Sequence, residues 1–323
     1  MHDEDLLLTL SANVKKYFFD RQYYQNEGLP TYSRIVGENP LPIPDELRDQ
    51  RGYLKEKYMV RNATRSDRED AEECVKRVFA HMLMQDPDNV SNIERHYMLL
   101  GATMPIRLEA TVGRHMRYVF YVKRPNIARI FGKVLYNFLS GLEEQDFLFS
   151  DGIYIERDVD GYHPDKNTRA HLQNHGTFVP SLVRLAALDE LLSINDLTEV
   201  RGENEQYVNI ITTAANKAAA FDFDLLFKPD SHEPKLIEFM RRRQWRIRPS
   251  LEREVLAAER AEIRGRILRY ENDFYALVQL MDDVPELVDR IRHFGQESFQ
   301  QYFVDNVMLL TSSLVRPNGI HRK

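Results

Sequence analysis

The sequence predicts an α+β protein that is mainly helical and contains a small antiparallel sheet. Apolar residues recur at helical spacing in four stretches, 4–26, 127–140, 180–194 and 251–313, whereas 105–110 and 116–123 alternate or run apolar and aromatic as strands do. The chain has 323 residues, of which 43% are hydrophobic, so it can bury one large core or two lobes.

The first hundred residues are predicted to form a helical N-terminal extension. After the helix at 4–26, the proline-rich stretch 39–44 forces an extended loop. Ser66 with Glu69, and Ser91 with Glu94, both fit the capping box, in which the Ser and Glu side chains satisfy free N–H groups at a helix start. We therefore expect two further helices to begin at Ser66 and Ser91.

Residues 101–180 are predicted to form a small α+β part. The two strand-like stretches are joined by a turn at 112–115, which predicts a β-hairpin ending in Lys123. The helix at 127–140 is followed by Gly141, a typical C-cap residue, and 153–156 reads as another short strand.

Residues 181–323 are predicted to form a mainly helical part with one short hairpin. The helix at 180–194 leads to Asp196, and the helical tail from 251 to 313 is broken near Pro285 and Gly295. Between them, a strand-like stretch around Asn209 and a second one ending at Asp222 are joined by a turn at 213–216. This hairpin would bring the Asn209 and Asp222 side chains together.

Composition limits the partners and the compartment. Charged residues make up 29% of the chain and the formal net charge is -6, so no basic field argues for a nucleic acid partner. The single cysteine, Cys74, excludes an internal disulfide framework and fits a reducing compartment. The acidic start lacks the basic region of a signal peptide and no apolar run reaches 18 residues, so we expect no transmembrane segment and a cytoplasmic location. Delivery to a host cytosol through another kind of signal stays open.

The order of these features resembles the protein-kinase-like superfamily over roughly residues 100–280. The resemblance rests on a hairpin ending in Lys123, then a helix, a strand and a second helix, followed by Asp196, Asn209 and Asp222. It is closer to the atypical branch, which contains HipA-type toxin kinases, phosphoinositide-kinase relatives and kinases that bacterial pathogens inject. It implies a two-lobed kinase-like core with a helical C-terminal lobe.

The resemblance also implies ATP, with Mg²⁺ or Mn²⁺, as the ligand. Phosphoryl transfer needs positioning and neutralisation of phosphate charge, which a Lys, an Asp that orients the acceptor hydroxyl and oxygen ligands for the metal can provide. The implied roles are Asp196 and Lys123 in catalysis, Lys123, Glu143 and Arg114 in nucleotide binding, and Asp222, Asp224 and either Asn209 or Asn204 in metal binding. If this is right, the Lys123 and Asp222 side chains should approach within salt-bridge or one-water reach.

The sequence departs from the family pattern in four ways. Gly113 is the only glycine between Gly101 and Gly132, so a glycine-rich phosphate loop is missing. The helix at 127–140 contains no acid to pair with Lys123; Glu143 or Glu144, or less suitably Glu156, could substitute. The interval from Asp196 to Asn209 is long, and Asp224 replaces the glycine of the Asp-Phe-Gly element. A pseudokinase, or a kinase fold used for nucleotidyl transfer, therefore remains an alternative.

An arginine cluster gives the main rival interpretation. Its members, which surround the only tryptophan, are Arg241, Arg242, Arg243, Arg246 and Arg248. They could form a surface paired to Glu238, Glu252 and Glu254, or bind a phosphate-rich ligand such as an inositol phosphate or phosphoinositide. The rival function is a non-enzymatic, mostly helical interaction protein that binds a polyanion or a protein partner, and under either function the acceptor or partner is open.

Overall fold

The computed structural model describes a part of the chain that begins at residue 73. The described residues are 73, 75–77, 79–80, 83, 85–97, 105–123, 126–141, 147–150, 153–158, 161–162, 164, 172, 176–194, 197–201, 204–207, 209–223, 226–227, 235–242 and 248–309. The predicted helix at 4–26, the loop at 39–44 and the helix start at Ser66 lie outside them.

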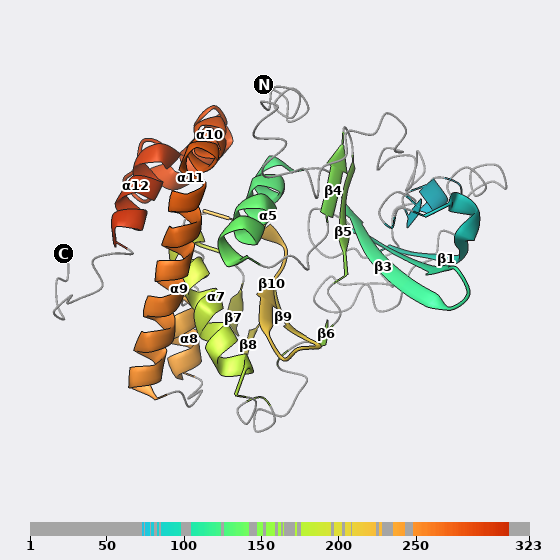
Figure 1. Ribbon diagram of the computed structural model, residues 1–323, viewed down its shortest axis with the longest axis horizontal. Coiled ribbons are helices and arrows are strands. Elements are labelled where there is room, and N and C mark those ends of the chain that lie inside the picture. Colours follow the sequence, from blue (N-terminus) through green and yellow to red (C-terminus); the bar gives the residue numbers. More distant parts are fainter. Residues whose placement is uncertain are drawn as a thin grey trace. The chain divides into compact units, whose positions relative to one another are not determined.

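The chain divides into two compact units. The described residues up to Asn126, together with 147–158, belong to unit 1, and those of 127–141 and from 161 onward belong to unit 2. The sequence-based division placed the helix at 127–140 with the sheet, whereas its contacts group it with the helices. Within the described residues the protein is α+β and mainly helical, with a small antiparallel sheet (Figure 1).

Unit 1 contains a five-stranded antiparallel sheet in the order β1-β2-β3-β5-β4. Its strands are β1 (Val90–Tyr97), β2 (Ile106–Val112), β3 (Met116–Lys123), β4 (Phe147–Ser150) and β5 (Ile153–Arg157), and a 3-10 turn, η3 (Pro87–Asn89), precedes β1. The β2–β3 hairpin and the strand at 153–156 are confirmed. Gly113 has a φ of 63° in the hairpin turn, a conformation that glycine adopts without strain.

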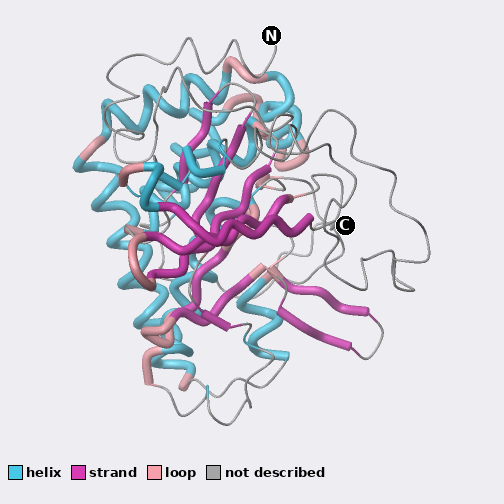
Figure 2. Tube along the Cα trace, turned by 90° about the vertical axis from the view of Figure 1, so that its right-hand side faces the viewer, coloured by secondary structure: helices cyan, strands magenta, loops and turns pink. Residues whose placement is uncertain are grey.

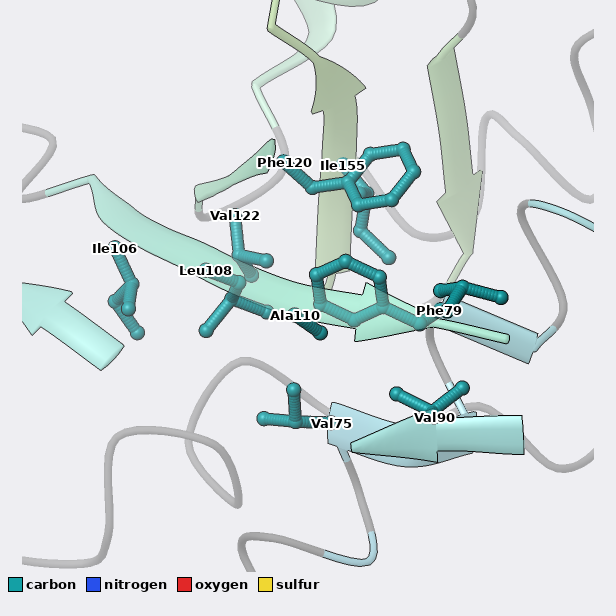
Figure 3. Packing of buried hydrophobic residues seen from close by; sticks show 10 residues of the cluster. Val75, Phe79, Val90, Ile106, Leu108, Ala110, Phe120, Val122 and Ile155 are labelled. Carbon is teal, nitrogen blue, oxygen red and sulfur yellow. The ribbon is translucent and has the colours of Figure 1, made fainter. Parts of the chain in front are cut away.

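The core of unit 1 lies on one face of this sheet. Side chains from β2, β3 and β5 pack together with Val75 and Phe79, which come from the helical residues before β1 (Figure 3). The Phe79 and Phe120 rings meet edge to face with centroids 4.8 Å apart, an arrangement that aromatic pairs favour. The alternation of residue types along β2 and β3 therefore places every second side chain in the core, as the sequence predicted.

The helix predicted to start at Ser91 is wrong, because Val90–Tyr97 forms strand β1. Its backbone pairs with β2, and a bulge between Ser91 and Glu94 leaves Asn92 with a φ of 50°. Val90 is buried and Ile93 packs against the same core. A capping box is worth about 1 kcal/mol, so pairing with β2 and burial of these two side chains override it.

Unit 2 consists mainly of helices with two small antiparallel sheets. The helices are α5 (Ile127–Ser140), α7 (Phe178–Leu192), α8 (Leu236–Arg242), α9 (Pro249–Arg269), α10 (Glu271–Asp282), α11 (Pro285–Arg292) and α12 (Phe299–Leu309). The strands are β6 (Gly161–Tyr162), β7 (Thr198–Arg201), β8 (Asn204–Tyr207), β9 (Ile210–Thr213) and β10 (Ala218–Ala220), drawn in magenta in Figure 2. They form the sheets β10-β9-β6 and β7-β8.

The predicted helix boundaries in unit 2 are largely confirmed. Helix α5 ends where expected, and Gly141 follows it with a φ of 64°. Pro285 starts α11, and Gly295, with a φ of 73°, lies between α11 and α12. Proline fits the first turn of a helix and glycine fits a left-handed position, so these residues mark the breaks for the expected reasons.

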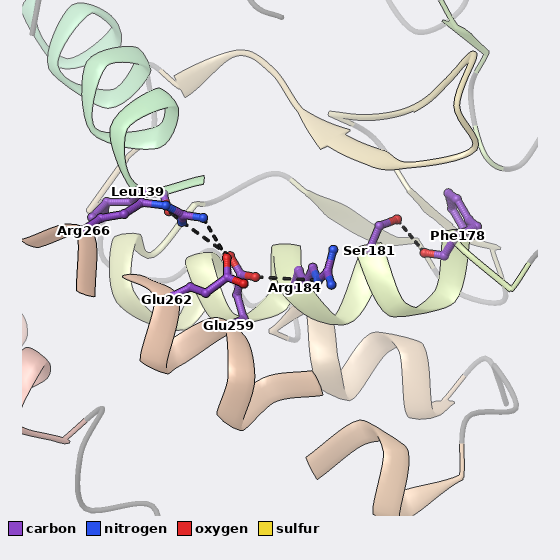
Figure 4. A network of polar contacts seen from close by, with 7 residues as sticks. All are labelled: Leu139, Phe178, Ser181, Arg184, Glu259, Glu262 and Arg266. Carbon is purple, nitrogen blue, oxygen red and sulfur yellow. Dashed lines mark hydrogen bonds and ion pairs between the residues drawn. The ribbon is translucent and has the colours of Figure 1, made fainter. Parts of the chain in front are cut away.

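A network of polar contacts joins α9 to α5 and α7 (Figure 4). The Arg266 guanidinium donates to the Leu139 carbonyl oxygen at the end of α5 and pairs with Glu262. It also lies 3.9 Å from the buried Glu259 carboxylate, which Arg184 of α7 approaches at 3.7 Å. Because a helix end leaves carbonyl groups unsatisfied, an arginine there fixes α9 against α5.

No described helix combines the length and the hydropathy that crossing a membrane would require.

Candidate active site

Lys123 forms a buried ion pair in unit 1. Its ammonium nitrogen lies 2.6 Å from Glu156 Oε1, and both side chains are less than a tenth exposed. The Tyr154 hydroxyl donates to the other carboxylate oxygen of Glu156 over 3.1 Å. Lys123 ends β3 and Glu156 lies on the neighbouring strand β5, so the sheet itself brings the two charges together. The acid that pairs with Lys123 is thus Glu156, the less favoured of the sequence candidates.

The hairpin predicted to join Asn209 and Asp222 is confirmed. Strands β9 and β10 pair antiparallel, with Ala220 opposite Ile210 and a turn after Thr213. At the open end of the hairpin, the Phe221 N–H donates to the Asn209 carbonyl oxygen over 3.1 Å. Asn209 and Asp222 therefore leave the hairpin at the same end. Asn204 begins β8 in the other small sheet, a placement that favours Asn209 of the two candidate ligands.

The backbone of Asp222 adopts an unusual conformation. Its φ is 61°, in the left-handed region that non-glycine residues rarely enter, although Asp and Asn tolerate it best. Its side chain is about one-third exposed, and one oxygen lies 3.4 Å from an Arg129 guanidinium nitrogen. Residues held in such conformations concentrate at functional sites, because the surrounding structure must overcome the strain. The Asp222 backbone is thus held in an uncommon conformation, and Arg129 of α5 lies beside its carboxylate.

One face of α5 holds the residues that follow β10. The Tyr136 hydroxyl accepts the Ala220 N–H over 3.1 Å, and the Tyr136 ring packs on Phe223 with centroids 4.7 Å apart. The Lys133 ammonium lies 5.7 Å from the centre of the Phe223 ring, within cation–π range. Phe223 is buried and touches Gly132 on the same face. Residues spaced three and four apart share a helix face, which explains why one stripe of α5 holds the whole segment.

Gly132 is needed for this close approach. A Cβ atom at residue 132 would lie 2.6 Å from Phe223 Cβ and 3.0 Å from the Phe223 carbonyl oxygen. We expect Gly132→Ala to lower the free energy of unfolding by about 1–3 kcal/mol in urea denaturation, because the added methyl group overpacks the contact.

Gly265→Ala provides the matched control, because a Cβ at residue 265 of α9 meets nothing within 4 Å. There the same change should stabilise the protein by up to about 1 kcal/mol through helix propensity. An equal change in the free energy of unfolding at both positions would contradict the close contact between Gly132 and Phe223.

The edge of β10 is satisfied by side-chain hydroxyls. The Ser181 hydroxyl of α7 accepts the Ala218 N–H over 2.8 Å and donates to the Phe178 carbonyl oxygen. The Tyr136 hydroxyl of α5 accepts the Ala220 N–H, the next one along β10 that points away from β9. The three alanines of β10 are buried and short enough to let both helices approach. The hairpin that carries Asp222 is thereby fixed to α5 and α7.

Asp189, a residue that the sequence did not single out, is a buried acid near the end of α7. Its Oδ2 accepts the Leu236 N–H at the start of α8 over 3.1 Å. Burial raises the pKa of its carboxyl group to about 6, against the opposing effect of Lys235 and with a smaller upward effect of Glu190. Tyr302 of α12 is another titratable neighbour, and burial raises the pKa of its hydroxyl to about 12. The Asp189 side chain thus joins α7 to α8. In the sequence it precedes the predicted catalytic residue Asp196 by one short stretch.

The raised pKa of Asp189 predicts a pH-dependent stability. Its folded pKa of about 6 exceeds the ordinary aspartate value of 3.8, so the folded state holds the proton more tightly than the unfolded state. This contribution is complete below about pH 4 and is lost as the pH rises through 6, a change of about 3 kcal/mol. Urea unfolding from pH 4.5 to 7.5 should therefore show a wild-type stability that falls relative to that of Asp189→Asn. Parallel pH profiles for the two proteins would contradict a raised pKa at Asp189.

Several predicted site residues lie outside the described residues. These are Asp196, Glu143, Asp224, Arg243 and Arg246. Of the others, Arg114 is exposed in the β2–β3 turn, and Lys123 and Asp222 belong to different units, so the expected approach of their side chains stays a prediction.

Part of the arginine cluster is visible at the junction of α8 and α9. Arg241 and Arg242 end α8, and Arg248 precedes α9. The Arg241 guanidinium lies 2.5 Å from a Glu252 carboxylate oxygen, and this hydrogen bond raises the arginine pKa. One member of the cluster is therefore paired with one of the acids expected for an ion-paired surface.

Asn209 and Asp222 are the two oxygen-bearing residues that the sequence offers as metal ligands at the open end of the hairpin, where their backbones leave it together. In proteins Mg²⁺ usually takes one or two protein oxygens together with phosphates and water. The part of the chain that the structure describes contains no group of three or more His, Cys, Asp or Glu residues that could hold a metal alone.

Comparison with known proteins gives no match, either to a family model or to a curated protein.

Proposed function

We propose that this protein is a divergent kinase-like phosphotransferase that uses ATP with Mg²⁺ or Mn²⁺. The observation that carries the proposal is the β9–β10 hairpin, whose open end presents Asn209 together with a strained, partly exposed Asp222. The buried Lys123–Glu156 pair in unit 1 supports it, because a lysine fixed by an acid is the group that such enzymes use on nucleotide phosphates.

In this proposal each residue has one role. Lys123 contacts the nucleotide phosphates, Asp222 and Asn209 hold the metal with Asp224 as a further candidate, and Asp196 orients the acceptor hydroxyl and takes its proton. The acceptor oxygen forms a bond to the γ-phosphorus while the bond from that phosphorus to the bridging oxygen breaks, so ADP leaves. Bound ATP supplies the phosphoryl group and the cation neutralises its charge. The acceptor is a protein, a lipid head group or a small molecule in the cytosol, or in a host cytosol for an injected protein.

Thermal unfolding with nucleotide tests this function. We expect ATP to stabilise the protein only when MgCl₂ or MnCl₂ is present, by about 2.7 kcal/mol at a hundredfold excess over the dissociation constant. Stabilisation without turnover on any acceptor would indicate a pseudokinase. No stabilisation by ATP, GTP or CTP with either cation would refute the proposal.

Anion binding at the arginine cluster is the second candidate function. The exposed side chains of Arg241 and Arg242 favour it, although Arg241 is already paired with Glu252. Under this proposal, inositol hexakisphosphate at low salt raises the melting temperature, and Arg242→Gln reduces the rise. An unchanged melting temperature would leave the cluster as an ion-paired surface.

A further inference from the structure

Helix α5 carries positive charge where the kinase resemblance leads one to expect an acid. Its fourteen residues include Arg129 and Lys133 and no Asp or Glu. Both side chains are almost completely buried, Arg129 at 0% exposure and Lys133 at 1%. The acid that pairs with Lys123 comes instead from β5, within unit 1. The charges of α5 are therefore directed at another group.

That group is the segment that carries Asp222. Arg129 lies 3.4 Å from the Asp222 carboxylate, and Lys133 lies over the ring of the next residue, Phe223. An arginine keeps its charge at any physiological pH, so the guanidinium is a permanent cation beside the proposed metal ligand.

We propose that Arg129 withholds Asp222 from a free divalent cation, so that the cation binds there only together with a nucleotide. This inference rests on the proposed function. A free Mg²⁺ or Mn²⁺ ion that approaches the carboxylate meets a fixed positive charge at close range in a partly buried site, where repulsion is strong. A complex of the cation with ATP carries net negative charge, so the same arginine attracts it. Arg129 is a specificity-determining residue that couples the metal site to the nucleotide.

Repulsion outweighs the other effect that Arg129 could have, which is to orient the carboxylate. The positive φ of Asp222 and the packing of Phe223 against Gly132 and Tyr136 hold the backbone from which the carboxylate projects, and neither depends on Arg129. Removing the guanidinium therefore changes the charge more than the geometry. The expected sign is a gain in affinity for the cation alone.

The test is a titration of Mn²⁺ without nucleotide, followed by the electron paramagnetic resonance signal of the free ion. We expect Arg129→Gln to bind Mn²⁺ at least about tenfold more tightly than the wild type, and Arg129→Lys, which keeps the charge, to stay much closer to the wild type. Adding Asp222→Asn to Arg129→Gln should abolish the gained site. Arg184→Gln, which removes a charge from α7, is the control and should change nothing.

Two results would overturn the inference. One is an Arg129→Gln affinity for Mn²⁺ alone that equals or falls below that of the wild type. The other is wild-type binding of Mn²⁺ alone that is as tight as binding with a non-hydrolysable ATP analogue and is lost in Asp222→Asn, a result that needs no Arg129 variant. If circular dichroism shows that Arg129→Gln does not fold, Arg129→Met replaces it.

The outcome also separates this inference from the proposed function. Metal-dependent nucleotide binding by the wild type, with no effect of Arg129→Gln on Mn²⁺, would refute the inference alone. A gained Mn²⁺ site that depends on Asp222, in a protein that binds no nucleotide, would refute the phosphotransferase proposal and leave the electrostatic effect of Arg129 standing.

Discussion

Asp222→Asn is expected to abolish metal-dependent binding of ATP and to lower turnover by at least about 10²-fold, because it removes the charged ligand of the proposed cation. Asparagine is the appropriate replacement, since it tolerates the left-handed conformation at φ 61° and keeps the shape of the side chain. Calorimetric titration of ATP with and without MgCl₂ measures the binding, and far-ultraviolet circular dichroism verifies the fold.

Asp196→Ala should behave differently, because its proposed role is to orient the acceptor and take its proton. We expect nucleotide affinity within a few-fold of the wild type and turnover lower by about 10²–10⁴-fold. Asp283→Asn, an exposed position that follows α10, is the matched control for loss of a carboxylate and should leave both quantities unchanged.

Equal nucleotide binding by the wild type and Asp222→Asn would show that Asp222 is not the metal ligand.

Lys123→Met is expected to lower the free energy of unfolding by about 3–5 kcal/mol, because the buried Glu156 carboxylate loses the ammonium group 2.6 Å away. The side chains are 6% and 8% exposed, so water compensates little. Urea denaturation measures the loss. Lys217→Met, a change at an exposed lysine, should stay within about 0.5 kcal/mol of the wild type.

A second change should restore most of this stability. In Lys123→Met/Glu156→Gln the buried charge is gone, and the glutamine can still accept the hydrogen bond from the Tyr154 hydroxyl. The double variant should therefore be folded and stable, yet bind ATP weakly. This matters for function, because inactivity of Lys123→Met alone could reflect unfolding. A double variant no more stable than Lys123→Met would contradict the account of the ion pair.

The local pattern of the sequence was sufficient for most elements of the fold. Helical spacing and Gly141 predicted α5 with its observed ends, and the two runs around Gly113 predicted the β2–β3 hairpin. The turn after Thr213 likewise predicted the hairpin that presents Asn209 and Asp222. These elements depend on neighbours a few residues apart, so their signals lie within one stretch of sequence.

The pairings in the candidate site could not be predicted in the same way. Glu156 reaches Lys123 only because β5 pairs with β3 across an intervening helix and strand, and α5 meets the segment after β10 from far along the chain. One feature of the sequence could have indicated the second pairing. Arg129 is a cation on the largely apolar helix α5, and a buried cation needs an anionic neighbour. Strand β1 was missed because a local capping pattern lost to pairing with β2.

The most direct test of the proposed function is a crystal structure with a non-hydrolysable ATP analogue and Mn²⁺, in which anomalous scattering locates the metal. We predict an anomalous peak in coordinating contact with the Asp222 carboxylate, with the Lys123 ammonium against a phosphate oxygen of the same nucleotide. A nucleotide whose phosphates and metal contact neither Asp222 nor Lys123 would contradict the account.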